Sequence, residues 1–208
     1  MDIDASMALI DSIISLEWDM FAAVNEGGER ASCQEDPATF YAMRSAQFKA
    51  WPLDALESYF GDLEAARSCG RNLVEEKYIH MMRTADPSGY EELLHRVTMP
   101  SAEAAGIARD ISDALLGQTR GLYEAYPYTT GHGRPLYAVQ DFSATSVETY
   151  QLGELLTYSV KTLEALKRHI SALEGSGRSL AREILENTVR FYGYGSLEAA
   201  EEGVIKNI

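Results

Sequence analysis

The sequence predicts an all-α fold: a compact single domain of seven to eight helices with no sheet. Apolar residues recur at spacings of three and four along almost the whole chain, which is the pattern of amphipathic helices. Helix-capping signals stand at the start of several segments, and no segment shows the apolar–polar alternation of paired strands. The chain has 208 residues, 46% hydrophobic and 24% charged, so it can bury a core.

Two helices are predicted near the N-terminus. Apolar residues at helical spacing from Met7 to Val24 predict a helix of roughly 20 residues, which ends at the Asn25-Glu26-Gly27-Gly28 run. Asp36 is a favourable N-cap for the second helix. Pro37 is favourable at its first position, because the N–H that proline lacks has no partner there.

The middle of the chain is predicted to contain further helices separated by turns. Residues 53–83 form either two consecutive helices or one that bends near Gly70. A turn at residues 86–89 precedes a short helix around residues 90–97. After a break at a proline, a long helix covers about residues 102–125.

The C-terminal part begins with an irregular stretch, residues 126–144, of the kind that is often functional. The Thr145-x-x-Glu148 capping box then predicts the start of a long helix that ends near Leu173. A further helix is predicted over residues 179–191, and a short one follows Ser196.

Composition excludes several classes of function. The 32 acidic and 18 basic residues give a net charge of −14, which argues against nucleic-acid binding and against docking on anionic lipid. No apolar run approaches the roughly 20 residues of a membrane span. The first residues are acidic rather than basic, unlike a signal peptide, and Cys33 and Cys69 are the only cysteines. We therefore expect a cytoplasmic protein.

Short sequence strings occur in a recognisable order: WDMF, ASCQ, GRNL, EKY, GRP, TS-ETY, GEL and TYS. In this order and spacing they resemble the bacterial family known as domain of unknown function 4125, from about Leu16 to Leu166. The resemblance implies a bacterial, soluble, helical domain and no established activity. We expect residues 1–175 to form the helical domain that carries these strings, and residues 176–208 to form a helical extension packed on it.

Three segments are rich in polar side chains: residues 17–34, 70–78 and 148–159. The third segment contains the strongest candidate for a catalytic group. Tyr150, Glu154 and Tyr158 follow one another at intervals of four, so one continuous helix would place them on one face. A partly desolvated Glu154 would have a raised pKa unless a cation paired with it, and a raised pKa suits general acid or base work. The alternative is a buried glutamate held by an arginine from another helix, with the tyrosine rings simply packed.

Two further residues complete the candidate catalytic set. Glu76 lies in the second polar segment, and its alternative interpretation is an ordinary solvated helix face. Cys33 lies just before the Asp36–Pro37 helix start and near Arg30, where its thiol pKa would be lowered and the thiolate could act as a nucleophile. The alternative for Cys33 is a small buried apolar residue.

Arginine side chains and their neighbours form the candidate ligand-binding set, because guanidinium groups bind carboxylates or phosphates through two parallel hydrogen bonds. Arg71 is the predicted anion anchor, and residues 126–144 are the predicted lid. The alternative is that these arginines only join helices against the excess of carboxylates. The predicted ligand-binding residues are Trp18, Asp19, Arg30, Gln34, Arg44, Arg71, Asn72, Lys77, Arg134 and Glu148.

No metal or cofactor is assigned from the sequence. Glu76 and His80 lie one helical turn apart, and Glu92-x-x-His95 has the spacing found in di-iron bundles. Such bundles need two of these motifs, and this chain contains one. The cofactor stays unknown.

These observations lead to two hypotheses of function. In the first, an internal polar cleft binds a small polar or anionic metabolite, and a site of Glu, Tyr and Arg gives the protein a potential enzymatic activity. In the second, the chain is an acidic helical interaction module. Nine of its first 36 residues are acidic and one is basic, which favours a basic protein partner or a second copy. The family resemblance implies a nucleotidyltransferase-like domain as one such partner.

Overall fold

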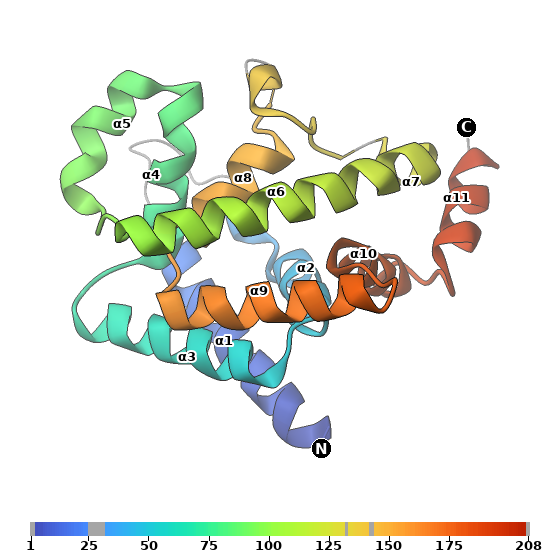
Figure 1. The fold of residues 1–208 in the computed structure, drawn as a ribbon, viewed down its shortest axis with the longest axis horizontal. Coiled ribbons are helices and arrows are strands. Elements are labelled where there is room, and N and C mark those ends of the chain that lie inside the picture. The colour runs from blue at the N-terminus through green and yellow to red at the C-terminus, as the bar shows by residue number, and fades with distance from the viewer. Residues whose placement is uncertain (1–2, 25–31, 132, 142–143, 207–208) are drawn as a thin grey trace.

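The computed structural model describes residues 3–24, 32–131, 133–141 and 144–206, and within these ranges every regular element is helical. The all-α prediction is therefore confirmed, but the count of seven to eight helices is too low. Eleven α-helices and three short 3₁₀ helices occur in the described ranges (Figure 1): α1 (Ile3–Ala23), η1 (Ser32–Glu35), α2 (Pro37–Phe48), α3 (Leu53–Ser68), α4 (Leu73–Ala85), α5 (Pro87–Leu93), η2 (Leu94–Arg96), α6 (Ala102–Ala125), α7 (Pro127–Thr130), η3 (Ala138–Gln140), α8 (Val147–Leu155), α9 (Val160–Gly175), α10 (Leu180–Phe191) and α11 (Leu197–Ile205).

Local capping explains most helix starts. The side chain of Asp36 accepts a hydrogen bond from the backbone N–H of Thr39, as predicted for the start of α2. Asp86 does the same for Gly89, so residues 86–89 begin α5 and are not a free turn. The Asp-Pro signal is the same at both places, and the prediction used it only once.

The predicted long helix between residues 145 and 173 is two helices. Its N-cap is Ser146, whose hydroxyl accepts from the backbone N–H of Thr149, and not Thr145 as the capping box suggested. α8 ends at Leu155, and Ser159 caps the start of α9 by accepting from Thr162. Apolar periodicity runs through this break, so the periodicity alone did not show it.

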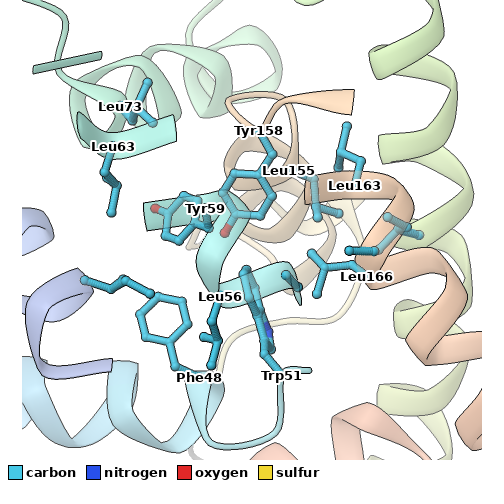
Figure 2. Packing of buried hydrophobic residues seen from close by; sticks show 14 of the residues in the cluster. Phe48, Trp51, Leu56, Tyr59, Leu63, Leu73, Leu155, Tyr158, Leu163 and Leu166 are labelled. Atoms are coloured by element: carbon cyan, nitrogen blue, oxygen red, sulfur yellow. The ribbon is translucent and has the colours of Figure 1, made fainter. Parts of the chain in front are cut away.

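Four helices pack around the main core. α9 packs against α6 on one side and α3 on the other, and α1 packs on α3 (Figure 1). Figure 2 shows the centre of this core, where the rings of Tyr59 and Tyr158 lie with their centroids 4.7 Å apart, beside Trp51. These aromatic and aliphatic side chains come from segments far apart in the sequence, so their burial joins the helices into one body.

The C-terminal helices contact two different parts of the molecule. α10 packs on α2 and α6 and contributes Leu180 to the main core. α11 lies against α7 at one end of the molecule (Figure 1), where a smaller apolar cluster includes Leu122 and Leu197. The stretch predicted as irregular therefore contains α7 and η3, and α7 is covered by α11. In the part of the chain that is described, no helix combines the length and apolar character needed to cross a bilayer.

Candidate functional site

A network of buried charges joins four helices beside the main core. Arg44 of α2 is at its centre. Its Nε and Nη2 donate to the two carboxylate oxygens of Glu17 on α1, at 2.6 and 2.5 Å. Its Nη1 donates to Oε1 of Glu154 on α8, at 3.0 Å. The guanidinium of Arg44 therefore binds two carboxylates that are far apart in the sequence.

Glu154 has further donors on both oxygens. Nζ of Lys77, on α4, lies 2.6 Å from Oε2. The Tyr158 hydroxyl and the side-chain amide of Gln47 donate to Oε1 at 2.6 and 3.0 Å. Both oxygens of the carboxylate are therefore fully engaged within the protein.

Glu17 is also held by a tyrosine. The hydroxyl of Tyr59, on α3, donates to Oε1 of Glu17 at 2.6 Å, and Glu17 is only 2% exposed. The two carboxylates and the two cations Arg44 and Lys77 balance each other. Such a closed set is costly to break, because removing one member leaves an uncompensated charge in a dry environment.

The ionisation of Glu154 follows from these partners. Burial alone would raise the pKa of Glu154, but the charges of Arg44 and Lys77 outweigh it and hold the pKa far below its ordinary value. Burial and the neighbouring carboxylates raise the pKa values of Tyr59 and Tyr158, so both hydroxyls stay protonated and keep donating. The carboxylate is therefore a fixed anion in the wall of the site, with no lone pair left for proton transfer.

A close approach of two helices brings Lys77 to Glu154. Gly153 of α8 faces α4, and a Cβ atom on it would lie 2.8 Å from Cγ of Met81 and 3.1 Å from the carbonyl oxygen of Lys77. Because glycine has no Cβ, α8 can lie directly on α4 at this point. The residue before Glu154 is thus part of what positions it.

A cavity of about 190 Å³ lies against the network, between α6, α8, α9 and α10. Its floor is buried and almost entirely apolar, whereas its half-buried and exposed lining residues are mostly polar. The floor consists of Trp51, Ile111, Leu155, Tyr158, Leu166, Ile170 and Leu180, with Glu154 in the wall. The mouth consists of Gln47, Leu115, Arg134, Val147, Tyr150, Gln151 and Ile184.

Tyr150 connects the buried network with the mouth of this cavity. Nζ of Lys77 lies 3.6 Å from the centroid of the Tyr150 ring, and the guanidinium carbon of Arg134 lies 4.5 Å from it. Nη1 of Arg134 also donates to the carbonyl oxygen of Thr145, at 3.1 Å. The exposed Arg134 is thereby held in one place above the cavity.

A second, much smaller cavity lies on the other side of Glu154. It has a volume of about 30 Å³ and is bounded by Glu17, Arg44, Tyr59 and Lys77, among others. This volume is close to that of a single water molecule in the liquid, so a metabolite does not fit there. Of these two cavities, only the one of about 190 Å³ has room for an organic molecule.

Several predicted site residues lie elsewhere. Trp18 packs against Phe21 and Phe40, and Asp19 is exposed, so neither lines the cavity as predicted. Arg71 was expected to anchor an anion, but its Nε and Nη2 bind both oxygens of Glu76 at 2.8 Å.

Glu76 and Asn72 have structural partners too. Glu76 is 1% exposed and is closed by the Arg71 pair, so the solvated-face interpretation is wrong, and it contributes nothing to the cavity lining. Asn72 caps α4 by accepting from Glu75 and donates to the carbonyl oxygen of Met20. These contacts fix α4 against α1.

Gln34 and Glu148 hold backbone segments. The amide of Gln34 donates to the carbonyl oxygens of Phe21 and Val24, which end α1. Glu148 accepts from the backbone N–H of Ala138 and so ties η3 to α8. Neither residue lines the cavity.

Two predicted residues are outside what the structure describes. Arg30 falls in the undescribed range 25–31. The backbone of Cys33 is part of η1, but its side chain is not described, so its proposed reactivity stays a prediction.

The Tyr158 hydroxyl donates to Glu154, but from a backbone position that the sequence did not predict. Tyr158 follows the end of α8, so it does not share a helix face with Tyr150 and Glu154. The irregular backbone between α8 and α9 turns its hydroxyl back onto the carboxylate. The predicted contact exists, whereas the predicted helical stacking is wrong.

Some residues of the site were missed. Gln47, Trp51 and Gln151 line the cavity, and Glu17 and Tyr59 complete the network. The signal that could have found Glu17 is its position on the apolar stripe of α1, where Ile10, Ile14 and Phe21 are buried. Tyr59 gave no comparable signal, because a buried tyrosine is ordinary in a core.

The two Glu–His pairs noted in the sequence do not form a metal-binding cluster among the described residues. His80 is buried, and its Nε2 has no hydrogen-bond partner within the described ranges. Desolvation lowers its pKa, so the ring is neutral. His95 is exposed, and its ring contacts the carbonyl oxygen of Glu92. Among the residues that the structure describes, no three His, Cys, Asp or Glu side chains are placed to hold a metal ion.

Comparison with known proteins identifies the family. The model of a family described as protein of unknown function (DUF4125) matches residues 7–202. The chain belongs to this family. The match confirms the resemblance seen in the sequence strings and extends beyond Leu166, through α10 and into α11. No curated protein and no solved structure matches the chain, so no relative of known activity constrains the function of this DUF4125 protein.

Proposed function

We propose that this DUF4125 protein binds a small organic molecule in the cavity between α6, α8, α9 and α10. The observation that supports the proposal is the gradient of the lining, which runs from a buried apolar floor at Trp51 and Leu166 to a polar mouth at Arg134 and Gln151. Ligand sites are typically concave and apolar with a few placed polar groups. The bound molecule would place its apolar part inward and its polar part at the mouth.

The size of the cavity sets the size of the molecule. Its volume is about 190 Å³. A dry protein cavity of roughly 150 Å³ accommodates benzene. A molecule with one six-membered ring and a short substituent therefore matches the available space.

The buried network would serve this function by forming part of the cavity wall, and not by reacting with the ligand. Because Glu154 is ionised and saturated by Arg44, Lys77 and Tyr158, it offers neither a proton nor a free lone pair. We therefore propose binding, and not proton transfer by Glu154, as the function of the site. The network fixes the relative positions of four helices, so that the cavity keeps its shape when it is empty.

Fluorescence of Trp51 tests the proposal. In a Trp18→Phe variant, Trp51 is the only tryptophan and forms part of the cavity floor. Titration with a neutral ring compound such as 2-phenylethanol should change its emission and raise Tm. An unchanged spectrum and an unchanged Tm up to the solubility limit of the probe would overturn the proposal.

A cavity-filling variant gives the matched control. Leu115 lines the cavity and its neighbour Leu116 does not, although both are half-buried on α6. Leu115→Phe should reduce the affinity for the probe by about tenfold or more, whereas Leu116→Phe should leave it nearly unchanged. Equal effects of the two substitutions would mean that the probe binds elsewhere.

The other hypotheses stay predictions. We propose that the protein is bacterial, as the family resemblance implies, and that it acts in the cytoplasm, as its sparse use of cysteine suggests. The acidic interaction module remains the alternative. A monodisperse monomer that retains no partner from a lysate would count against it.

A further inference from the structure

We infer that the molecule bound in this cavity is a small carboxylate with a ring-sized apolar body, and that Arg134 binds its carboxylate group. This inference rests on the proposed function and names the chemical class of the ligand. Three features of the molecule support it: the open edge of one guanidinium, the charge balance around the cavity, and the position of the polar groups at its mouth.

The open edge of Arg134 is the first observation. Its Nη1 is used by the carbonyl oxygen of Thr145, and its guanidinium plane lies over the ring of Tyr150. No described residue accepts a hydrogen bond from its Nε or from its Nη2. These two atoms form the side of a guanidinium that binds a carboxylate through two parallel hydrogen bonds. Arg44 uses this same side to bind Glu17.

The charge balance is the second observation. The buried cations Arg44 and Lys77 are matched by Glu17 and Glu154. Arg134 adds one positive charge and forms no ion pair with a carboxylate of the described residues. In a chain with a net charge of −14, an unmatched cation at the mouth of a cavity is the group that a ligand anion would neutralise.

The lining also argues against a cationic ligand. Glu154 is the one acidic side chain in the described lining of the cavity. Both of its oxygens already accept hydrogen bonds from protein donors. An amine entering the cavity would meet no free carboxylate and would stand near Arg134, so a cation is disfavoured by both contacts and charge.

The third observation is the depth at which the polar groups lie. Arg134 is exposed, and Tyr150 and Gln151 are half-buried, whereas the apolar floor is fully buried. A carboxylate bound at Arg134 would stay partly hydrated at the mouth while its ring occupies the floor. This arrangement avoids the large cost of burying an unpaired charge.

Three probes of one shape test the inference: phenylacetate, 2-phenylethanol and phenethylamine. Each is titrated into the Trp18→Phe variant near neutral pH, with Trp51 emission as the signal. We expect phenylacetate to bind about tenfold or more tightly than the alcohol, and the amine to bind most weakly. Because the three share one ring and nearly one size, the difference reports the charge of the end group.

Substitutions at Arg134 assign the effect to this residue. Arg134→Gln should remove the preference for the acid over the alcohol, and Arg134→Lys should retain only part of it, because an ammonium has charge but no planar fork. Arg120→Gln is the control, since Arg120 is an exposed arginine of α6 outside the cavity lining. It should retain the full preference.

The outcomes separate this inference from the proposed function. If the alcohol binds and the acid binds no better, or if the amine binds most tightly, the carboxylate inference is wrong and the cavity remains a binding site. If the acid is preferred equally in Arg134→Gln, Arg134 is not its partner and the inference is also wrong. If none of the three probes changes Trp51 emission or Tm, both proposals fail.

Discussion

Arg44 borders the smaller cavity and Arg134 the larger one, and the two arginines differ in burial and in hydrogen bonding. Arg44 is buried and uses its guanidinium on Glu17, Gln47 and Glu154. Arg134 is exposed and gives one hydrogen bond, to a backbone carbonyl. A cation whose donors are all engaged by the protein stabilises the fold, whereas one that is held in place with an open edge is prepared for a ligand.

The largest expected effect distinguishes these two arginines directly. Arg44→Met leaves the carboxylates of Glu17 and Glu154 buried without their shared partner, so we expect a loss of about 3–5 kcal/mol in the free energy of unfolding. Arg134→Met, at an exposed position, should cost less than about 1 kcal/mol. Urea denaturation measures both. Equal losses of unfolding free energy in the two variants would show that Arg44 and Arg134 do not differ in their contribution to stability.

The second prediction concerns acid. The pKa of Glu154 is depressed from its ordinary value of 4.5, so the folded chain binds this proton more weakly than the unfolded chain does. The corresponding stability is present above pH 4.5 and is lost as the pH falls below it. Glu154→Gln should be less stable at neutral pH and should lose less stability between about pH 5 and pH 3. Parallel curves for the two proteins would contradict this.

The third prediction tests the close approach on which the network depends. Gly153→Ala adds a Cβ against Met81 and the backbone of Lys77, so α8 must move away from α4, at a cost of about 1–3 kcal/mol. Gly121→Ala is the control, because nothing lies near its added Cβ on α6. That control should be stabilised by about 0.5–1 kcal/mol. A stable Gly153→Ala protein would show that the approach is not needed.

The smallest expected effect concerns Tyr150, the residue shared by both regions. Tyr150→Leu removes the ring that contacts Lys77 and Arg134, and we expect it to cost about 1–2 kcal/mol. It should also weaken phenylacetate binding, because Arg134 loses its support. Tyr150→Phe retains the ring and should keep most of the stability. Thermal denaturation of the two variants, followed by probe titration, measures both effects.

Local capping chemistry was readable from the sequence where one residue decides the outcome. Asp36 with Pro37, Ser179 and Ser196 start helices as predicted. The break before Ser159 was not readable, because the apolar residues on both sides of it continue the helical period. The Ser159 hydroxyl can cap α9 only in the non-helical backbone that follows α8. The start of α5 at Asp86 was readable from its Asp-Pro signal but was interpreted as a turn.

The candidate site was predictable by residue type but not by partner. Glu154, Lys77 and Arg44 were recognised as candidates on predicted helices, and Arg134 in the stretch predicted as irregular. Arg71 was predicted to anchor a ligand anion, yet its guanidinium binds Glu76, five residues away. The actual partner, Arg44, is 110 residues from Glu154. Pairing at that separation depends on which helices pack together, and sequence spacing carries no information about that.

By itself, the sequence determined that this chain is helical, acidic and a member of a family without assigned activity, because periodicity, composition and short strings are local properties. Only the tertiary structure decided that Arg44 is paired with buried carboxylates, and that Arg134 has donors with no acceptor among the described residues. Gly153 lets α8 lie on α4, and the carboxylates of Glu17 and Glu154 converge on Arg44. The guanidinium of Arg134 instead lies over the ring of Tyr150 in the cavity lining. Each of these depends on contacts between helices, where burial makes an unpaired charge costly and therefore selects its partner.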